Sequence, residues 1–235
     1  KYVGVRKNKK FDELFEDRVW CLFASLGFSH MNQDRYFKMS YDYQNPNITQ
    51  QIDVLFSLGG DGTLLDTLSV VKKSCIPVLG INLGHLGFLT SVGRADIKNL
   101  LTEIEKKHYK FEKHSVLQAS CEALIGKRFA INEVCVRSLS PGELLEIDAY
   151  IGEEYLTTYT SDGLIATTPT GSTAYSMSCG GPIISPNSKC LCITPISPHN
   201  LTLRPLIIPD DSQIKFVINS SRKGISLHFD SQIYP

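Results

Sequence analysis

Ten residues, 54–63, constrain this chain more than any other stretch. An apolar run at 54–58 breaks into three glycines around one aspartate, and apolar residues at helical spacing follow from Leu64. This order predicts a strand, a tight turn and a helix. Glycines let the backbone approach a bound group closely, and the free N–H groups at a helix N-terminus can meet an anion. The pattern therefore favours a phosphate site over a purely structural turn, and its residues are Gly59-Gly60-Asp61-Gly62-Thr63.

Two familiar phosphate-binding patterns do not fit this turn. It lacks the Gly-Lys-Ser/Thr ending of the Walker motif, and its glycines do not have the spacing of the dinucleotide fingerprint. Asp61 is the only ionisable residue in the turn. Help with phosphate charge must therefore come from the backbone, from a metal ion or from residues elsewhere.

Composition narrows the class of protein. With 235 residues, 42% of them hydrophobic, the chain can bury a substantial core in one large or two small domains. Lys+Arg and Asp+Glu number 24 each, and this balance does not favour nucleic acid or an anionic membrane as a partner. No apolar run reaches the roughly 18 residues that a membrane helix needs. Seven cysteines, mostly in apolar runs, suit a reduced, cytoplasmic protein.

The first half of the chain alternates strands with helices. Strands are predicted at 2–5, 54–58 and 76–82, and helices at 11–26, after Thr63 and at 95–109. This alternation predicts an α/β domain over 1–112 with a Rossmann-like parallel sheet and a site at the C-terminal ends of its strands. A second glycine-rich connection, 83–89, follows the third of these strands. Its His85 is a catalytic candidate, although a single histidine in such a loop is more often structural.

The period of the hydrophobic pattern changes to two after Ser115. Short apolar segments are separated by Gly, Pro, Asn or Ser, which predicts an all-β domain over 113–235. The predicted strands are residues 116–124, 129–136, 145–151, 155–160, 164–167, 190–193, 206–208, 214–218 and 225–229.

Two places in the second half depart from plain strand chemistry. Asn132 and Glu133 interrupt an apolar strand, where a carboxylate must be paired, solvated or used on a ligand. Residues 162–175 pass from a strand through a hydroxyl-rich turn into an apparent helix. Capping of that helix by Ser172 or Thr173 is the simpler explanation, but it accounts for only one of the hydroxyls in the turn. We therefore interpret the turn as suited to hydrogen-bonding a sugar, a base edge or a phosphate, through Thr167, Thr168, Thr170, Ser172 and Thr173.

Taken together and in this order, these residues resemble the NAD kinase family. The glycine–aspartate turn is shared with lipid kinases and phosphofructokinases, so by itself it does not distinguish NAD kinases from those enzymes. The conjunction with later segments does: Gly84-His85-Leu86-Gly87-Phe88, Asn132-Glu133, Thr168-Pro169-Thr170-Gly171-Ser172-Thr173-Ala174-Tyr175, Ser197-Pro198-His199-Asn200-Leu201 with Arg204-Pro205, and Asp230-Ser231-Gln232.

The resemblance implies an activity and its reactants. The γ-phosphoryl group of ATP would pass to the 2′-hydroxyl of the adenosine ribose of NAD, giving NADP and ADP, with a divalent metal ion, expected to be Mg²⁺, whose protein ligands stay unassigned. Asp61 would accept the hydroxyl proton. The phosphates of ATP would be cradled by Gly59, Gly60, Gly62 and Thr63. Alignment and charge stabilisation would supply most of the acceleration.

The family's NAD site carries over by resemblance, residue by residue. Asn132 would lie near the adenine, Glu133 would bind ribose hydroxyls and Asp162 would lie toward the nicotinamide. The other residues matched to NAD binding are Asp61, Gly62, Thr170, Thr173, Ala174, Tyr175 and Ser178. A single tyrosine such as Tyr175 is more commonly a packed aromatic with a satisfied hydroxyl, and that alternative stays open. A homodimer or homotetramer is also implied.

Three other functions compete with this one. A lipid or sugar-phosphate kinase could share the glycine–aspartate turn, but the neutral charge gives no support for a membrane-facing patch. A non-catalytic dinucleotide-binding sensor could keep the pocket, although the intact Asp61 argues against it. NAD-dependent redox chemistry is weaker still, because the spaced-glycine fingerprint is absent.

Overall fold

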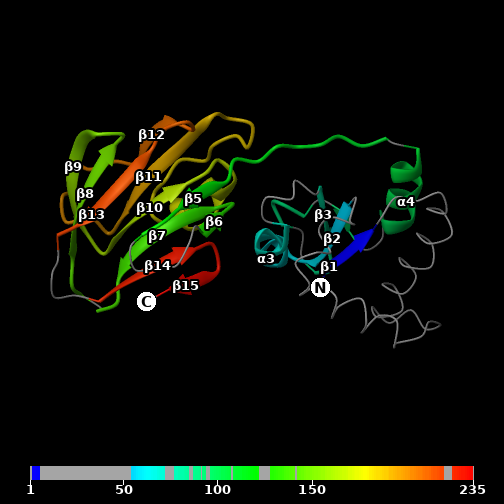
Figure 1. Ribbon diagram of the computed structural model, residues 1–235, viewed down its shortest axis with the longest axis horizontal. Coiled ribbons are helices and arrows are strands. Elements are labelled where there is room, and N and C mark those ends of the chain that lie inside the picture. The colour runs from blue at the N-terminus through cyan, green and yellow to red at the C-terminus, as the bar shows by residue number, and fades with distance from the viewer. Residues whose placement is uncertain are drawn as a thin grey trace. The chain divides into compact units, whose positions relative to one another are not determined.

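The computed structural model describes residues 2–5, 54–71, 77–84, 87–90, 92–93, 96–106, 108–121, 128–140, 142–219 and 224–234. The chain divides into two compact units, Lys1–Phe111 and Glu112–Pro235, whose elements are labelled in Figure 1. The predicted helix at 11–26 and the candidate His85 lie outside the described residues.

The first unit contains a four-stranded sheet in the order β1-β2-β3-β4. Its strands are β1 (Tyr2–Val5), β2 (Val54–Gly59), β3 (Val78–Asn82) and β4 (Val92–Gly93). β2 runs parallel to β3, and β3 runs parallel to β4. β1, however, pairs with β2 in the antiparallel direction, so the prediction of a wholly parallel sheet was wrong. An apolar segment specifies burial but not direction, and an edge strand can pair either way.

Two helices are described in this unit, α3 (Asp61–Val71) and α4 (Ile97–Glu105). α3 follows β2 in the predicted order of strand, turn and helix, but it begins at Asp61, within the predicted turn. The middle of β2 is wholly buried, with Leu55 fully inaccessible and Phe56 and Leu58 nearly so. This burial of consecutive residues is typical of a strand in a parallel sheet, which is covered on both faces. α4 is shorter at both ends than the predicted 95–109.

The second unit is built on antiparallel sheets (Figure 1). The largest has six strands in the order β12 (Leu206–Pro209), β11 (Cys190–Ile196), β10 (Gly163–Thr167), β7 (Glu133–Ser138), β14 (Ile225–Phe229) and β15 (Gln232–Tyr234). A second sheet is formed by β13 (Ile214–Ile218), β8 (Leu145–Ile151) and β9 (Glu154–Ser161), and a third by β5 (Leu117–Ala119) and β6 (Arg128–Ala130).

Most predicted strands of this unit are confirmed. The bounds of β8, β13 and β14 agree with the prediction to the residue. The predicted strand at 129–136 is instead two strands, β6 and β7, which are interrupted at Ile131 and Asn132. β15 was not predicted.

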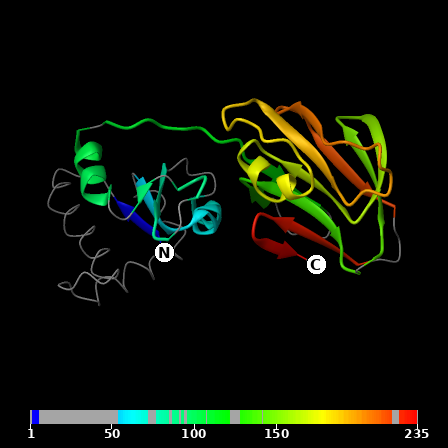
Figure 2. The ribbon, with the colours of Figure 1, turned by 180° about the vertical axis from the view of Figure 1, so that it is seen from behind.

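The six-stranded sheet has two different faces. Alternate residues of β7 and β10, among them Val136 and Leu164, join an apolar core with Leu145 and Ile147 of β8. On the opposite face Cys135 packs in a separate cluster beneath residues 175–179. The 3₁₀ turn Thr170–Thr173 and the one-turn helix α5 (Tyr175–Ser178) belong to the segment that covers this face, drawn in yellow in Figure 2.

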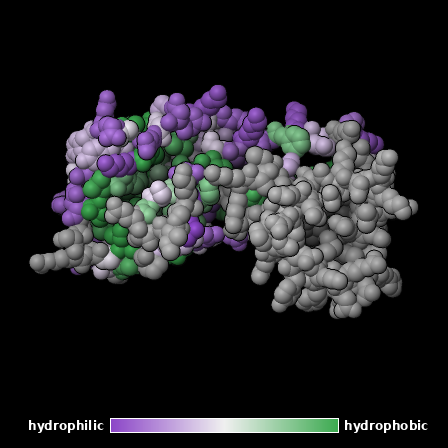
Figure 3. All heavy atoms as spheres, in the orientation of Figure 1, coloured by the Kyte–Doolittle hydropathy of each residue, from purple (hydrophilic) through white to green (hydrophobic). Residues whose placement is uncertain are grey.

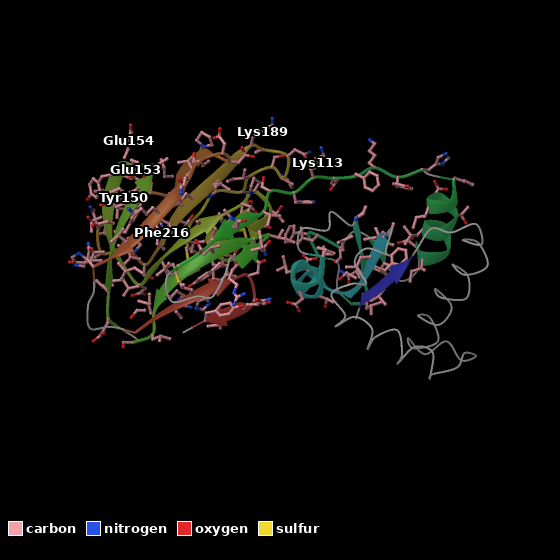
Figure 4. All side chains as sticks on the ribbon, viewed as in Figure 1. Lys113, Tyr150, Glu153, Glu154, Lys189 and Phe216 are labelled. Atoms are coloured by element: carbon pink, nitrogen blue, oxygen red, sulfur yellow. The ribbon has the colours of Figure 1, made fainter. Side chains whose placement is uncertain are left out.

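The three-stranded sheet separates its faces in the same way. Phe216 of β13 packs against the apolar core. Tyr150 of β8 lies with Lys215, whose Nζ is 5.3 Å from the centroid of the Tyr150 ring, and with Tyr155, whose ring centroid is 5.6 Å away. Figure 4 labels Tyr150 and Phe216 on these neighbouring strands. The space-filling view in Figure 3 shows hydrophobic residues on the face of this unit toward the viewer, bordered above by hydrophilic side chains.

Candidate active site

The glycine–aspartate turn joins β2 to α3 by a close approach of two residues. A Cβ atom on Gly59 would lie 2.2 Å from the Thr63 hydroxyl oxygen, and Gly59 has a φ of +158°. A side chain there would therefore displace the start of the helix. The first intrahelical bond runs from the Leu64 N–H to the Gly60 carbonyl, at 3.2 Å. The N–H groups of Gly60, Asp61 and Gly62 thus lie at the N-terminus of the helix, where an anion can bind.

Gly60 and Gly62 have no such steric reason to be glycine. A Cβ atom built on either would meet no heavy atom within 4 Å, and both residues are exposed. The described fold therefore tolerates a side chain at each position. The absence of a side chain leaves room for a group to lie against the backbone at both places.

The Asp61 carboxylate is held by the loop that follows β3. Its Oδ1 accepts hydrogen bonds from the Leu89 N–H (3.2 Å), the Thr90 N–H (3.0 Å) and the Thr90 hydroxyl (2.9 Å). Its Oδ2 accepts one described bond, from the Phe88 N–H at 2.7 Å. A carboxylate has about four lone-pair sites in all. Oδ1 is therefore fully used, and Oδ2 keeps the capacity to accept one more proton donor.

Thr90 is itself fixed by a second layer of contacts. Its hydroxyl oxygen accepts a hydrogen bond from Asn82 Nδ2 at 2.9 Å, and Asn82 Oδ1 accepts one from the Gly84 N–H at 2.8 Å. Thr90 is fully buried. A Cβ atom on Gly80 would lie 2.8 Å from the Thr90 methyl carbon. The end of β3 thus orients the side chain that orients Asp61. The sequence analysis named neither Thr90 nor Asn82.

In the second unit, Asn132 and Glu133 present buried acceptors that lack a partner. Among the described residues, neither Asn132 Oδ1 nor Glu133 Oε2 has a hydrogen-bond donor. Burial, and secondly the charge of Asp230, raise the pKa of Glu133 to about 7. Buried acceptors without donors destabilise a protein. These two neighbouring acceptors can therefore receive donors from a ligand.

The backbone that carries these two side chains is clamped by Asp230. Oδ1 of Asp230 accepts hydrogen bonds from the N–H groups of Asn132 (2.8 Å) and Glu133 (3.1 Å), and Oδ2 accepts one from Ile131 (2.8 Å). In return the Asp230 N–H donates to the Glu133 carbonyl at 3.1 Å. The sequence analysis placed Asp230 in a family segment but gave it no role.

The hydroxyl-rich turn uses most of its hydroxyls internally. The Thr167 hydroxyl donates to the Asn132 carbonyl at 2.9 Å, and the Thr168 hydroxyl donates to the Ile131 carbonyl. The Ser172 hydroxyl donates to the Pro169 carbonyl at 2.6 Å. These three side chains are fully buried. The prediction that the whole turn addresses a ligand was therefore wrong for them, because the buried carbonyls beside them need donors.

Helix capping by Ser172 or Thr173 does not explain these hydroxyls either, because the residues at the start of the 3₁₀ turn and of α5 form no side-chain cap. The Thr168 hydroxyl oxygen does accept the Gly171 N–H of the 3₁₀ turn, at 3.2 Å. The Thr170 hydroxyl lies 2.9 Å from His114 Nδ1. A Cβ atom on Gly171 would lie 2.3 Å from the Asn132 carbonyl oxygen, so the turn packs directly on the backbone that carries Asn132.

The predicted NAD-site residues of this unit lie along one strand pair. β10 pairs with β7 so that Thr167 is opposite Glu133 and Gly163 is opposite Arg137. Asp162 precedes Gly163 and is five residues from Thr167, so it lies at the far end from Glu133, roughly 16 Å along the strand at about 3.3 Å per residue. The structure therefore brings Asn132, Glu133 and Thr170 together and leaves Asp162 apart from them.

Tyr175 lies toward the Asp162 end. Its ring centroid is 5.6 Å from the guanidinium carbon of Arg137. Burial raises the pKa of Tyr175, and Arg137 opposes the shift. Thr173 and Ala174 are half-buried, whereas Ser178 is exposed at the end of α5.

Within the described residues, no three His, Cys, Asp or Glu side chains gather in an arrangement that could hold a metal ion. In the same residues, no helix has the length and apolarity needed to cross a membrane.

Comparison with known proteins matches both units to one family. Residues 22–109 match the model of the ATP-NAD kinase N-terminal domain, and residues 131–234 match that of the ATP-NAD kinase C-terminal domain. The chain belongs to the NAD kinase family. The family match confirms the two-domain organisation with a sheet-rich C-terminal half.

Individual relatives carry the same name. The NAD kinase of Flavobacterium johnsoniae is 38% identical over 92% of this chain and 78% of its own length. That of Flavobacterium psychrophilum is 43% identical over 80% of this chain. The matched part spans 65% of the length of the F. psychrophilum protein.

Solved structures show the same fold. Yeast NADH kinase complexed with NADH is 34% identical, with a TM-score of 0.74 over 80% of this chain and 56% of its own. An NAD kinase from Archaeoglobus fulgidus in complex with ATP is 24% identical, with a TM-score of 0.65 over 81% of this chain and 73% of its own.

Proposed function

We propose that this protein is an NAD kinase, which transfers the γ-phosphoryl group of ATP to the 2′-hydroxyl of the adenosine ribose of NAD and forms NADP and ADP. The observation that carries the proposal is the Asp61 carboxylate, whose Oδ1 is fully used while Oδ2 can accept a proton. It stands beside two glycines that the described fold does not require. The relatives named NAD kinase favour NAD over a lipid or a sugar phosphate as the acceptor.

Asp61 acts as the general base in this reaction. The 2′-hydroxyl donates a hydrogen bond to Oδ2. As its oxygen forms a bond to the γ-phosphorus, the proton passes to the carboxylate, and the bond from phosphorus to the bridging oxygen of ADP breaks. A sugar hydroxyl is a much weaker acid than a carboxylic acid, so the transfer accompanies P–O bond formation rather than preceding it. The backbone at Gly59, Gly60, Gly62 and Thr63 lies against the phosphates of ATP.

The two buried acceptors of the second unit recognise the adenosine part of NAD. Asn132 Oδ1 takes a donor from the adenine, and the Glu133 carboxylate takes ribose hydroxyls. Each contact would satisfy an acceptor that now lacks a donor. Thr170, Thr173, Ala174, Tyr175 and Ser178 surround the adenosine, and Asp162 lies toward the nicotinamide. Their spread along β7 and β10 suits an extended ligand.

We extend the proposal to the organisation of the chain. Residues 1–112 form the phosphate-donor domain, with a Rossmann-like core of β2, β3, β4 and α3, and residues 113–235 form the NAD-binding domain. The family resemblance supports a homodimer or homotetramer, which light scattering would test. Mg²⁺ typically binds one or two carboxylates together with substrate phosphates. The described residues form no group of three or more His, Cys, Asp or Glu side chains that could hold the ion, so its protein ligands stay unassigned.

The test is NADP formation by the purified protein with NAD, ATP and Mg²⁺, read by an NADP-specific dehydrogenase. We expect turnover by the wild-type protein and none above background by Asp61→Asn, with NAD affinity by calorimetry within about threefold of wild type, because the substitution removes a base and keeps the side chain's shape. Near-normal turnover by Asp61→Asn would remove Asp61 from the base role. NAD binding without turnover by the wild-type protein would indicate the non-catalytic sensor.

A further inference from the structure

The turn between β14 and β15 contacts the segment that carries Asn132 and Glu133, because β14 pairs directly with β7. Asp230, in this turn, accepts hydrogen bonds from three consecutive backbone N–H groups at 131–133. These bonds span 97 to 99 residues of sequence. They hold the chain where β6 ends and β7 begins.

We propose that Asp230 is a positioning residue of the dinucleotide site, which fixes the direction in which Asn132 and Glu133 present their buried acceptors. The inference rests on the proposed function, because it assumes that these acceptors bind NAD. Asp230 itself touches no substrate in this proposal and acts only through the backbone and the charge of its neighbours.

A carboxylate suits this position better than any other side chain. Three N–H groups converge on two oxygens, and an ionised carboxylate accepts at both oxygens and donates nothing. Hydrogen bonds to an ionised acceptor are also stronger than neutral ones. Asp230 has a φ of +52°, a left-handed conformation that Asn also adopts readily. Asp230→Asn therefore keeps the backbone conformation and turns one acceptor into an NH₂ group that faces a backbone N–H.

Asp230 also affects Glu133 electrostatically. The charged and titratable groups that act on Glu133, or on which it acts, come from three elements: Asp230 from the β14–β15 turn, Cys135 on β7 and Cys179 just after α5. Burial and then Asp230 raise the pKa of Glu133. Ribose hydroxyls donate to an ionised carboxylate, so NAD binding favours the deprotonated form. Without the charge of Asp230, Glu133 would ionise at a lower pH, and tight NAD binding would extend to more acidic conditions.

The experiment compares full-length wild type, Asp230→Asn and Asp210→Asn. Asp210 is an exposed residue just after β12 and serves as the matched control. We expect KM for NAD to rise about tenfold or more in Asp230→Asn, the size of effect that loss of one or two charged hydrogen bonds produces. KM for ATP should stay within about twofold, and Asp210→Asn should match the wild type. The midpoint of the pH dependence of KM for NAD should move to lower pH only in Asp230→Asn.

Each result decides between positioning and a merely structural role. A variant that unfolds more easily, yet keeps the KM for NAD and the pH midpoint of the wild type, overturns the proposal. Asp230→Ala leaves the three N–H groups to water and serves as a second variant if Asp230→Asn does not fold. Failure of both to fold would identify Asp230 as a folding residue and overturn the positioning role. A wild type that binds NAD without turnover contradicts the kinase proposal alone, and calorimetric affinities then replace KM in the same comparison.

Discussion

Gly87 and Asp61 lie so close together that no side chain fits between them. A Cβ atom on Gly87 would come within 2.2 Å of Asp61 Oδ1 and 2.5 Å of Oδ2. The loop can therefore direct its N–H groups at the carboxylate only because position 87 has no side chain. The proposed base and the loop that orients it depend on each other across 26 residues of sequence.

Replacement of Gly87 by alanine should therefore displace Asp61. We expect kcat for NADP formation to fall about 100-fold, because a misplacement of about 1 Å in a reacting group has effects of that order. Affinity for NAD, measured by calorimetry, should change far less. Gly84→Ala is the control, since a Cβ atom there meets no heavy atom within 4 Å. An equal fall of kcat in Gly87→Ala and Gly84→Ala would contradict a clash between a side chain at position 87 and Asp61.

The Thr90 hydroxyl should contribute to the rate through Asp61. Thr90→Val keeps the shape of the side chain and removes its hydrogen bonds with Asp61 Oδ1 and Asn82 Nδ2. We expect kcat to fall about tenfold and the free energy of unfolding to fall by about 1–2 kcal/mol. Thr90→Ser keeps the hydroxyl and should restore most of the rate. If the valine and serine variants have the same kcat, the hydroxyl has no such role.

Gly62→Ala should separate stability from activity. Alanine in a helix is more stable than glycine by about 0.5–1 kcal/mol, and nothing described lies within 4 Å of the added Cβ. The variant should therefore resist denaturant slightly better than the wild type. Its KM for ATP should rise about tenfold or more, because the methyl group occupies the place of a phosphate. Full activity in a stabilised variant would argue against a phosphate at this turn.

Glu133 should make the stability of the ligand-free protein depend on pH. Its pKa is about 7 in the folded state and near 4.5 when solvated. Between these values the folded protein holds a proton that the unfolded chain has released, so this stability is present below pH 4.5 and is lost as pH rises to 7. At pH 8, Glu133→Gln should be more stable than the wild type by up to about 3 kcal/mol. It should also bind NAD more weakly.

Denaturant unfolding of wild type and Glu133→Gln across pH 4–8 measures this difference. Parallel stability curves would show that Glu133 ionises normally. In the wild type, KM for NAD should fall as pH rises through about 7, because the ionised carboxylate accepts the ribose hydroxyls.

Local patterns predicted most elements of this fold. β8 and β14 alternate apolar and polar residues, and β13 is a short run of β-branched and aromatic residues with one lysine. Such strands can be recognised from their own sequence. The break between β6 and β7 could not be recognised from the local sequence, because Asn132 is held there by Asp230, 98 residues away. The direction of β1 depends on its pairing with β2 rather than on its four residues.

The residues of the candidate site likewise divide into those that the local sequence could predict and those that it could not. Asp61 and its glycines stand out because several unusual residues are adjacent. Thr90 carries no local signal, since its importance comes from a carboxylate 29 residues earlier. The hydroxyls of Thr167, Thr168 and Ser172 suggested a ligand by their number, but the sequence does not say which hydroxyls the backbone consumes.

The alternation of side chains along β7 limits which mutations this protein can tolerate during evolution. Val136 joins the apolar core, and Val134 packs in a separate apolar cluster with Ala130 and Phe229. Cys135 packs on the opposite face, where the alternation of side chains also places Glu133. Because side chains alternate strictly, the insertion of one residue would exchange the two sets. A substitution on one face of the strand leaves the side chains of the other face in place. The residues that would bind a ligand can therefore change without loss of folding. An insertion or deletion within β7 would disrupt both faces of the strand at once. We therefore expect members of the family to differ in residue type along this strand but not in its length.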